Sequence, residues 1–185
     1  MRNEEWGMGS EKIFLIGIPN SGKTTLGKLA AEKLRIPFYD TDLLICEKLD
    51  NPLDLFRMAF SGHFVAEQIK IISKLAKLKG KAIIATGAEA ALSPECASLM
   101  KPGGTVINIK RKPDILLEEF KKSGNRGMIM KEENGEEINM QEEAIRLYAK
   151  ECSQYEALAD LSLENDGTED EGLEKLLKLI ENCGN

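Results

Sequence analysis

Short hydrophobic runs alternate along the chain with longer stretches in which hydrophobic residues recur at helical spacing. The first run, Lys12–Ile16, is rich in β-forming residues and ends at Gly17, which is typical of a strand buried on both faces. Leucines and alanines then recur with helical spacing and predict a helix over about residues 22 to 34. The other predicted elements are strands at 37–39, 81–85, 105–109 and 159–163, a helix over about 69–78 that stops before Gly80, and a helix over about 171–181. This alternation favours a parallel sheet covered on both sides, so we expect a five-stranded, three-layer α/β domain.

The alternation is interrupted between Glu118 and Glu143, where the sequence becomes charged and Met-rich. One interpretation is a solvated acidic surface loop. The other is a mobile lid over a nucleotide, at about residues 119–140. Residues 1–10 are polar and acidic and predict a flexible leader, so we expect one domain over residues 11–185.

Composition narrows the class of protein. The 185 residues are 42% hydrophobic, which is enough for a core, and the net charge of −6 disfavours a general nucleic-acid binder. No hydrophobic run approaches the roughly 20 residues that span a bilayer, and the N-terminus has no signal-peptide pattern. The cysteines form no CxxC pair, which favours reduced thiols; they are Cys46, Cys96, Cys152 and Cys183. We therefore expect a cytoplasmic monomer with no membrane or nucleic-acid partner.

Residues 17–24, GIPNSGKT, fit the P-loop pattern G-x-x-x-x-G-K-[ST] between the first predicted strand and helix. Glycines let successive backbone N–H groups converge on phosphate oxygens at the positive end of the helix. Lys23 can place a cation on the β- and γ-phosphates, and the Thr24 hydroxyl can ligate Mg²⁺. A Gly-rich turn without function would share the glycines, but the full pattern in its required context predicts nucleoside triphosphate binding.

The kind of P-loop protein follows from where the carboxylates lie. A GTPase would carry an Asn-Lys-x-Asp motif, and a typical ATPase an Asp at the end of a later strand; here the strands lead into Thr86, Lys110 and Glu164. Asp40 and Asp42 instead follow the second strand, at the sheet edge that the P-loop occupies. One could orient Mg²⁺ through water while the other binds or deprotonates an acceptor hydroxyl. The simpler interpretation is a helix N-cap with a solvated neighbour.

The sequence resembles the shikimate kinase family from about Ile13 to Leu163. The resemblance rests on the P-loop and on the segments FYDTDLLI, LDLF, ATGAEAALSP, NRGMI and YEALADLSLE. It implies a five-stranded parallel sheet with a nucleotide-covering lid, and transfer of phosphate from ATP, with Mg²⁺, to a hydroxyl of shikimate.

The resemblance also implies roles for particular residues. Thr24 and Asp40 would bind the metal, Asp40 through water, while Asp42 and Gly87 would contact the small-molecule acceptor. Asp42, Lys23 and the lid residue Arg126 would be the catalytic residues. The residues expected to bind ATP are Gly17, Asn20, Ser21, Gly22, Lys23, Thr24, Thr25 and Arg126, with Lys121 and Lys122 near the adenine.

The chain departs from the family where the acceptor should bind. Val65 and Gln68 stand where the family has an Arg that grips the acceptor carboxylate and the Glu that partners it, and Glu151 stands in place of a second Arg. In the family, the loop that contacts the acceptor begins with three glycines, and Glu89 stands in place of the third. Arg126 is followed by GMI, where the family has PLL. Each lost charged hydrogen bond costs about 1.5–3 kcal/mol. Two such losses would weaken acceptor binding by about two orders of magnitude.

Three functions stay open on the sequence alone. The leading one is phosphorylation of shikimate; the others are phosphorylation of a different hydroxylated metabolite and nucleotide binding without turnover. Arg57 or Arg146 could replace the missing arginines, although exposed surface charges are the simpler interpretation. His63, the one histidine, is expected to be structural.

Overall fold

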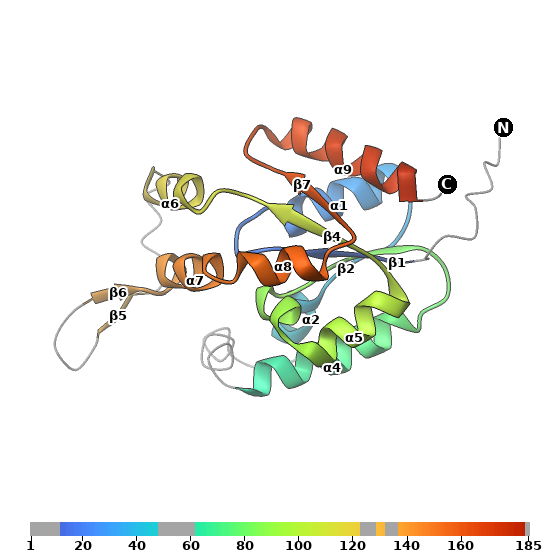
Figure 1. Cartoon of the computed structure of the whole chain (residues 1–185), viewed down its shortest axis with the longest axis horizontal. Coiled ribbons are helices and arrows are strands. Elements are labelled where there is room, and N and C mark those ends of the chain that lie inside the picture. Colours follow the sequence, from blue (N-terminus) through green and yellow to red (C-terminus); the bar gives the residue numbers. More distant parts are fainter. Residues whose placement is uncertain (1–11, 48–61, 123–128, 132–136, 184–185) are drawn as a thin grey trace.

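Five parallel strands form the central sheet in the order β2-β3-β1-β4-β7 (Figure 1). The computed structural model describes residues 12–47, 62–122, 129–131 and 137–183. The strands are β1 (Lys12–Ile16), β2 (Phe38–Asp40), β3 (Ala82–Ala85), β4 (Gly104–Lys110) and β7 (Leu161–Glu164). The predicted five-stranded α/β fold is confirmed.

The central strand β1 is buried along its whole length, as its unbroken hydrophobic run predicts. It pairs with β3 on one side and with β4 on the other. Ile13 and Leu15 belong to one hydrophobic cluster, whereas Phe14 and Ile16 belong to the other. Because successive side chains of a strand point to opposite faces, this one strand supports two cores.

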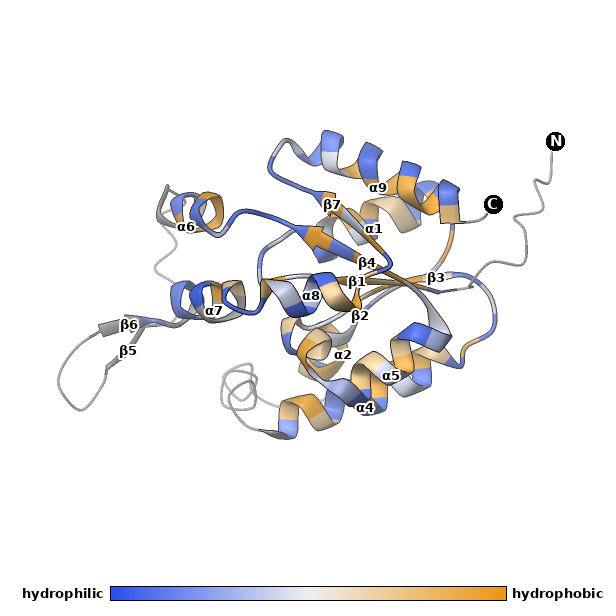
Figure 2. Cartoon of the chain, in the orientation of Figure 1, coloured by the Kyte–Doolittle hydropathy of each residue, from blue (hydrophilic) through white to orange (hydrophobic). Residues whose placement is uncertain are grey.

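Helices cover both faces of the sheet (Figure 1). One face packs against α1 (Lys23–Leu34) and α9 (Glu169–Cys183). The other face packs against α2 (Thr41–Cys46), α4 (Gly62–Ala76), the 3₁₀ helix η1 (Ala88–Leu92), α5 (Pro94–Gly103) and α8 (Cys152–Leu158). Figure 2 shows the strands mainly in the hydrophobic colour and the covering helices in alternating hydrophobic and polar bands, as amphipathic helices on a core require.

The stretch that interrupts the alternation contains regular structure in its described parts. It begins in α6 (Pro113–Lys122), passes through the antiparallel strands β5 (Ile129–Lys131) and β6 (Glu137–Asn139), and ends in α7 (Met140–Ala149). Buried Leu116 and Ile145 anchor α6 and α7 to the core, while the β5–β6 pair extends away from the sheet (Figure 1).

Two predicted boundaries differ from the structure by two residues for a visible reason. The helix expected to end at about residue 78 ends at Ala76, because the next two N–H groups turn back by only three residues, to Lys74 and Leu75. The strand expected from residue 159 begins at Leu161, because the Ala159 N–H caps α8 on the Tyr155 carbonyl. Other boundaries differ by one or two residues, except that α4 begins at Gly62, before the predicted 69. The predicted leader at residues 1–10 lies outside the described residues.

The structure also bears on the state of the cysteines and on the length of the hydrophobic helices. All four cysteines are free thiols. Within the described residues, no helix is both long and apolar enough to cross a bilayer.

Candidate active site

The turn from β1 to α1 holds the GIPNSGKT sequence. Gly17 has φ of 144° and Gly22 has φ of 101°, both in the region that favours glycine. A Cβ at Gly17 would lie 2.4 Å from the backbone oxygen of Ile109 on β4. The first and second motif glycines are therefore required by backbone conformation, and the first also by the closeness of β4.

The N-terminus of α1 is left without a side-chain cap. Its N-cap residue is Gly22, and the first turn holds no acidic residue, so the N–H groups of this end are not occupied by the helix's own side chains. Thr24 and Thr25 are exposed there, whereas Ser21 is fully buried. Together with the helix dipole, this end is suited to bind an anion such as a phosphate group.

Lys23 is buried and folds back over the turn. Its Nζ donates hydrogen bonds to the backbone oxygens of Gly17 at 2.9 Å and Ile18 at 2.8 Å. Burial lowers the pKa of Lys23 to about 8. The nearby negative charges of Asp42, Asp40 and Glu89 act in the opposite direction, in that order of size. The ammonium group is therefore poorly solvated, and acidic residues from three other elements lie close enough to influence its pKa.

Asp40 links the end of β2 to the P-loop. One carboxylate oxygen accepts a hydrogen bond from the Thr24 hydroxyl at 2.6 Å. The other accepts from the backbone N–H groups of Asp42 at 3.0 Å and Leu43 at 3.2 Å, so Asp40 is also the N-cap of α2. Asp40 therefore caps α2 and also lies beside Thr24 of the P-loop.

The oxygen atoms of Thr24 and Asp40 fit a magnesium ion, because Mg²⁺ prefers oxygen ligands and keeps much of its water and phosphate coordination. In the described part of the chain, no group of three or more His, Cys, Asp or Glu side chains could hold a metal by itself. A metal bound here would therefore be shared with the phosphates.

Asp42 stands two residues further along, in the first turn of α2. Burial raises the pKa of its carboxyl to about 6, and the charge of Asp40 adds to this effect. Lys23 and a hydrogen bond from Gln68 act in the opposite direction; the Gln68 Nε2 lies 2.5 Å from the Asp42 Oδ1. Asp42 is thus a half-buried carboxylate near the P-loop lysine.

Gly87 completes this edge of the sheet. Its N–H donates a hydrogen bond to the Thr41 hydroxyl at 3.0 Å, which ties the end of β3 to the start of α2. The structure therefore brings together Lys23, Asp40, Asp42 and Gly87 at the carboxyl ends of neighbouring parallel strands, where open α/β sheets bind their ligands.

Comparison with known proteins identifies the group to which this arrangement belongs. A model of the shikimate kinase family matches residues 19–181. The chain belongs to the shikimate kinase family. It is 32% identical over 171 residues to the shikimate kinase of Thermoanaerobacter pseudethanolicus, covering 91% of this chain and 95% of that protein. It is 30% identical over 170 residues to the shikimate kinase of Neisseria meningitidis serogroup C, with the same coverage of both chains.

A solved structure agrees with the sequence relatives. Shikimate kinase from Acinetobacter baumannii in complex with shikimate superimposes with a TM-score of 0.76 and 23% identity, over 94% of both chains. This likeness shows the shared fold. Membership of the shikimate kinase family makes the chain an ATP-binding P-loop kinase, a phosphotransferase.

The residues that depart from the shikimate kinase pattern are arranged as follows. Gln68 is fully buried against Asp42, and Val65 lies half-buried one turn earlier on α4. Glu151 is the N-cap residue of α8, and its carboxylate accepts a hydrogen bond from Gln154. Glu89 lies in η1, close enough to Lys23 to influence its pKa. None of these four positions supplies a cation for an acceptor carboxylate.

The remaining sequence predictions have mixed outcomes. Arg146 is exposed and pairs with Glu142 at 3.6 Å, so it is a surface charge as expected. His63 is exposed on α4. Arg57, Arg126 and the side chains of Lys121 and Lys122 lie outside what the structure describes.

Two contributors to the site were missed by sequence reasoning. Gln68 was considered only as a replaced charge partner, and Asn165 was not considered. Asn165 is buried directly after β7, and its Nδ2 donates a hydrogen bond to the backbone oxygen of Ser21 at 2.8 Å. The available signal was a polar residue directly after the carboxyl end of a predicted parallel strand.

Replacing Asn165 with alanine is expected to weaken MgATP binding about 10-fold, because one buried hydrogen bond that fixes the P-loop is lost. Isothermal titration calorimetry with MgATP measures this change. Asn182→Ala, an exposed change on α9, is the matched control. Unchanged affinity in Asn165→Ala would show that the P-loop keeps its shape without this contact.

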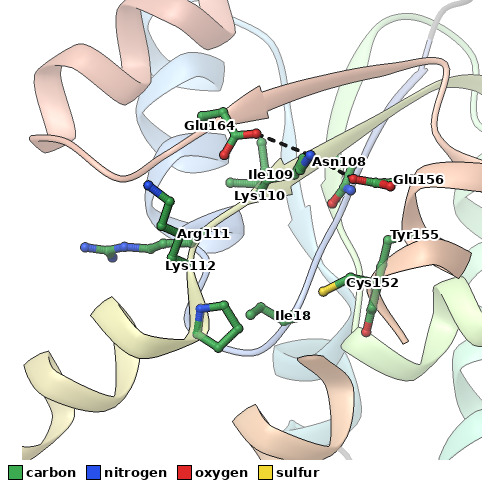
Figure 3. Close-up of a pocket in the computed structure, with 11 residues that line it drawn as sticks. Ile18, Asn108, Ile109, Lys110, Arg111, Lys112, Cys152, Tyr155, Glu156 and Glu164 are labelled. Carbon is green, nitrogen blue, oxygen red and sulfur yellow. Dashed lines mark ion pairs between the residues drawn. The ribbon is translucent and has the colours of Figure 1, made fainter. Parts of the chain in front are cut away.

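A pocket of about 170 Å³ lies beside the P-loop, between the end of β4, the start of α6, and α8 (Figure 3). Ile18, Asn108, Cys152 and Tyr155 are among the residues that line it. Lys110 at its rim pairs with Glu156 at 2.7 Å and with Glu164 at 3.2 Å. Lys23 and the two aspartates do not line this pocket, whose lining includes Ile18 of the turn before α1.

Proposed function

We propose that the protein transfers the γ-phosphoryl group of MgATP to a hydroxyl of shikimate. The observation that carries the proposal is the convergence of the P-loop lysine, the Thr24–Asp40 pair and Asp42 at one sheet edge. A nucleotide-binding module without turnover would have no use for a second, half-buried carboxylate beside Lys23.

The P-loop side binds the nucleotide. The backbone N–H groups around Gly17 and from Asn20 to Thr25 hold the phosphates, and Lys23 leaves its two backbone carbonyl partners to bind them instead. Magnesium held by Thr24 and, through water, by Asp40 would offset charge on the β- and γ-phosphates. Arg126 from the lid is assigned to the transferring phosphoryl group on the family resemblance.

The Asp42 side orients the acceptor. Its carboxylate would accept a hydrogen bond from the reacting hydroxyl and take up the proton as the new bond to the γ-phosphorus forms, while the bond from the γ-phosphorus to the β–γ bridging oxygen breaks and ADP leaves. Gly87 lies against Asp42, because a Cβ at this position would be 2.6 Å from the Asp42 Oδ1, and its backbone is assigned to the acceptor on the family resemblance. Transfer then depends mainly on holding hydroxyl and phosphate in line, as phosphoryl transfer generally does.

Shikimate is proposed as the acceptor because the curated relatives are shikimate kinases. Val65 and Glu151 replace the arginines that would grip its carboxylate, so we expect turnover with a high KM. The carboxylate should contribute little, and shikimate and its neutral methyl ester should have similar KM values.

A coupled ADP-release assay with millimolar shikimate and, separately, methyl shikimate tests both points. Turnover of both, with KM values within about threefold (under 1 kcal/mol), supports the proposal. A strong preference for shikimate would show that another cation binds the carboxylate. Tight MgATP binding with no ADP release on shikimate would refute the proposed acceptor, and polyols and sugars would then be tested.

A further inference from the structure

Gln68 makes an unusual contact from the middle of α4. Its side chain is fully buried, yet the hydrogen bond recorded for it is from Nε2 to the Asp42 Oδ1, at 2.5 Å. With the amide in this orientation its donor faces the carboxylate, whereas the flipped orientation would set oxygen against oxygen. The amide thus holds one oxygen of Asp42 and leaves the other for a ligand.

The backbone at Gly87 makes this contact possible. A Cβ at this position would lie 2.4 Å from Gln68 Nε2 and 2.6 Å from Asp42 Oδ1. The Gly87 N–H is in turn bound to the Thr41 hydroxyl at 3.0 Å, so the backbone is fixed there. Three elements therefore enclose the amide and the carboxylate: α4, the start of α2 and the end of β3.

The contact is not optimal for stability. Gln68 Oε1 is buried and, among the described residues, has no hydrogen-bond partner. An unsatisfied buried oxygen costs folding free energy, and an apolar side chain of similar size would avoid this cost. The presence of an amide here is explained if its single hydrogen bond serves Asp42.

Charge also favours an amide over a carboxylate at position 68. A Glu there would lie against Asp42, and Val65 offers no cation to balance the pair. Two carboxylates in contact repel each other unless they share a proton. The amide supplies a donor at the same place without adding a negative charge.

We propose that Gln68 is a positioning residue, which fixes the carboxylate of Asp42 so that its second oxygen faces the acceptor hydroxyl. This inference rests on the proposed function for the role of Asp42. The nucleotide side is unaffected, because Gln68 binds Asp42 and makes no recorded hydrogen bond to the P-loop.

Replacing Gln68 with methionine, which is similar in size and has no donor, tests the proposal. We expect kcat with shikimate to fall about 10- to 100-fold, as for a lost charged hydrogen bond. The KM for ATP should stay unchanged, and the melting temperature should stay equal or rise. Lys70→Met, an exposed change on the same helix, is the control and should leave all three values unchanged. Gln68→Leu serves as a second variant if Gln68→Met does not fold.

A role in packing alone predicts a different result: a lower melting temperature with kcat within about threefold of wild type, which would overturn the proposal. Crystal structures of wild type and Gln68→Met give a readout that needs no acceptor. A displaced or doubly placed Asp42 carboxylate in the variant supports the inference, and an unmoved carboxylate overturns it. If the wild type does not turn over shikimate, the proposed function fails, and these two crystal structures still decide the role of Gln68.

Discussion

Replacing Lys23 with methionine is expected to lower kcat about 1,000-fold and at the same time to raise the melting temperature of the ligand-free protein. The loss of rate follows from removing a full charge that acts on the transferring phosphoryl group, an effect at the upper end of that for one lost transition-state donor. A steady-state ADP-release assay measures the rate, and differential scanning calorimetry measures the melting temperature.

The gain in stability follows from the pKa of Lys23. Its folded pKa, about 8, lies below the ordinary value of 10.5, so keeping the side chain charged in the folded state below pH 8 costs about 3 kcal/mol. Losing the hydrogen bonds to Gly17 and Ile18 offsets part of this, leaving about 1–2 kcal/mol. That corresponds to several degrees in a chain of this length.

The pH dependence provides an internal check. For a group with a depressed folded pKa, the penalty is complete below the folded value and disappears above the unfolded value. The advantage of Lys23→Met should therefore be full at pH 7 and vanish as the pH rises from about 8 to 10.5. Lys28→Met, exposed on the same helix, should change neither rate nor stability. A Lys23→Met protein that keeps wild-type kcat would contradict the assigned role.

Replacing Asp42 with asparagine is expected to lower kcat by about 10²- to 10⁴-fold, the range typical of a general base. Asparagine keeps the size of the side chain, and its oxygen can still accept the Gln68 hydrogen bond. MgATP affinity should change little, because the phosphates are held by the P-loop. Rapid-quench measurement of phosphoryl transfer, with calorimetry for MgATP binding, separates the two effects.

The same change should stabilise the ligand-free protein above pH 6. The folded pKa of Asp42, about 6, is raised above the ordinary value of 3.8. The folded state favours the protonated form of Asp42. The stability that this form gives is therefore complete below pH 3.8 and is lost as the pH rises through 6. The melting temperature of Asp42→Asn should exceed that of wild type at pH 7.5, with a difference that shrinks towards pH 5. Asp170→Asn, exposed at the start of α9, is the control, and an equal shift in that variant would contradict the explanation.

The expected stability gains of the Lys23 and Asp42 variants have the same physical cause. A buried lysine and a half-buried aspartate are each held in a charged form that burial disfavours. Their proximity offsets only part of this cost, and bound MgATP would supply anionic oxygens in place of the two backbone carbonyls that Lys23 contacts. The ligand-free site is thus less stable than neutral side chains would make it, which is common where strong binding groups are preorganised.

Several parts of the site were predictable from local sequence. The P-loop follows from its glycine and lysine spacing, because backbone conformation at Gly17 and Gly22 is a local property. The nearness of Asp40 and Asp42 to the P-loop followed from topology, since the carboxyl ends of parallel strands share an edge. The N-cap role of Asp40 was predicted as an alternative to its placement at the site, whereas the structure gives one oxygen to each.

Other features depend on contacts between residues far apart in the chain. Gln68 meets Asp42 across 26 residues, and Asn165 meets Ser21 across 144. The position of Asn165 after a strand placed it at the correct edge of the sheet, but local sequence does not show the partner of either residue, because each could equally have been exposed on its own element.

The sequence by itself determined the alternation of elements, the phosphate-binding turn and the loss of the arginines at two acceptor positions. These features depend on side-chain periodicity, on backbone preference and on residue identity, all of which can be read locally. Only the tertiary structure decided that the Thr24 hydroxyl binds Asp40, that Lys23 is buried among acidic residues, and that Gln68 holds Asp42. Those facts depend on how α2, α4 and β3 pack around one sheet edge, because distance and burial arise only when separate segments are brought together.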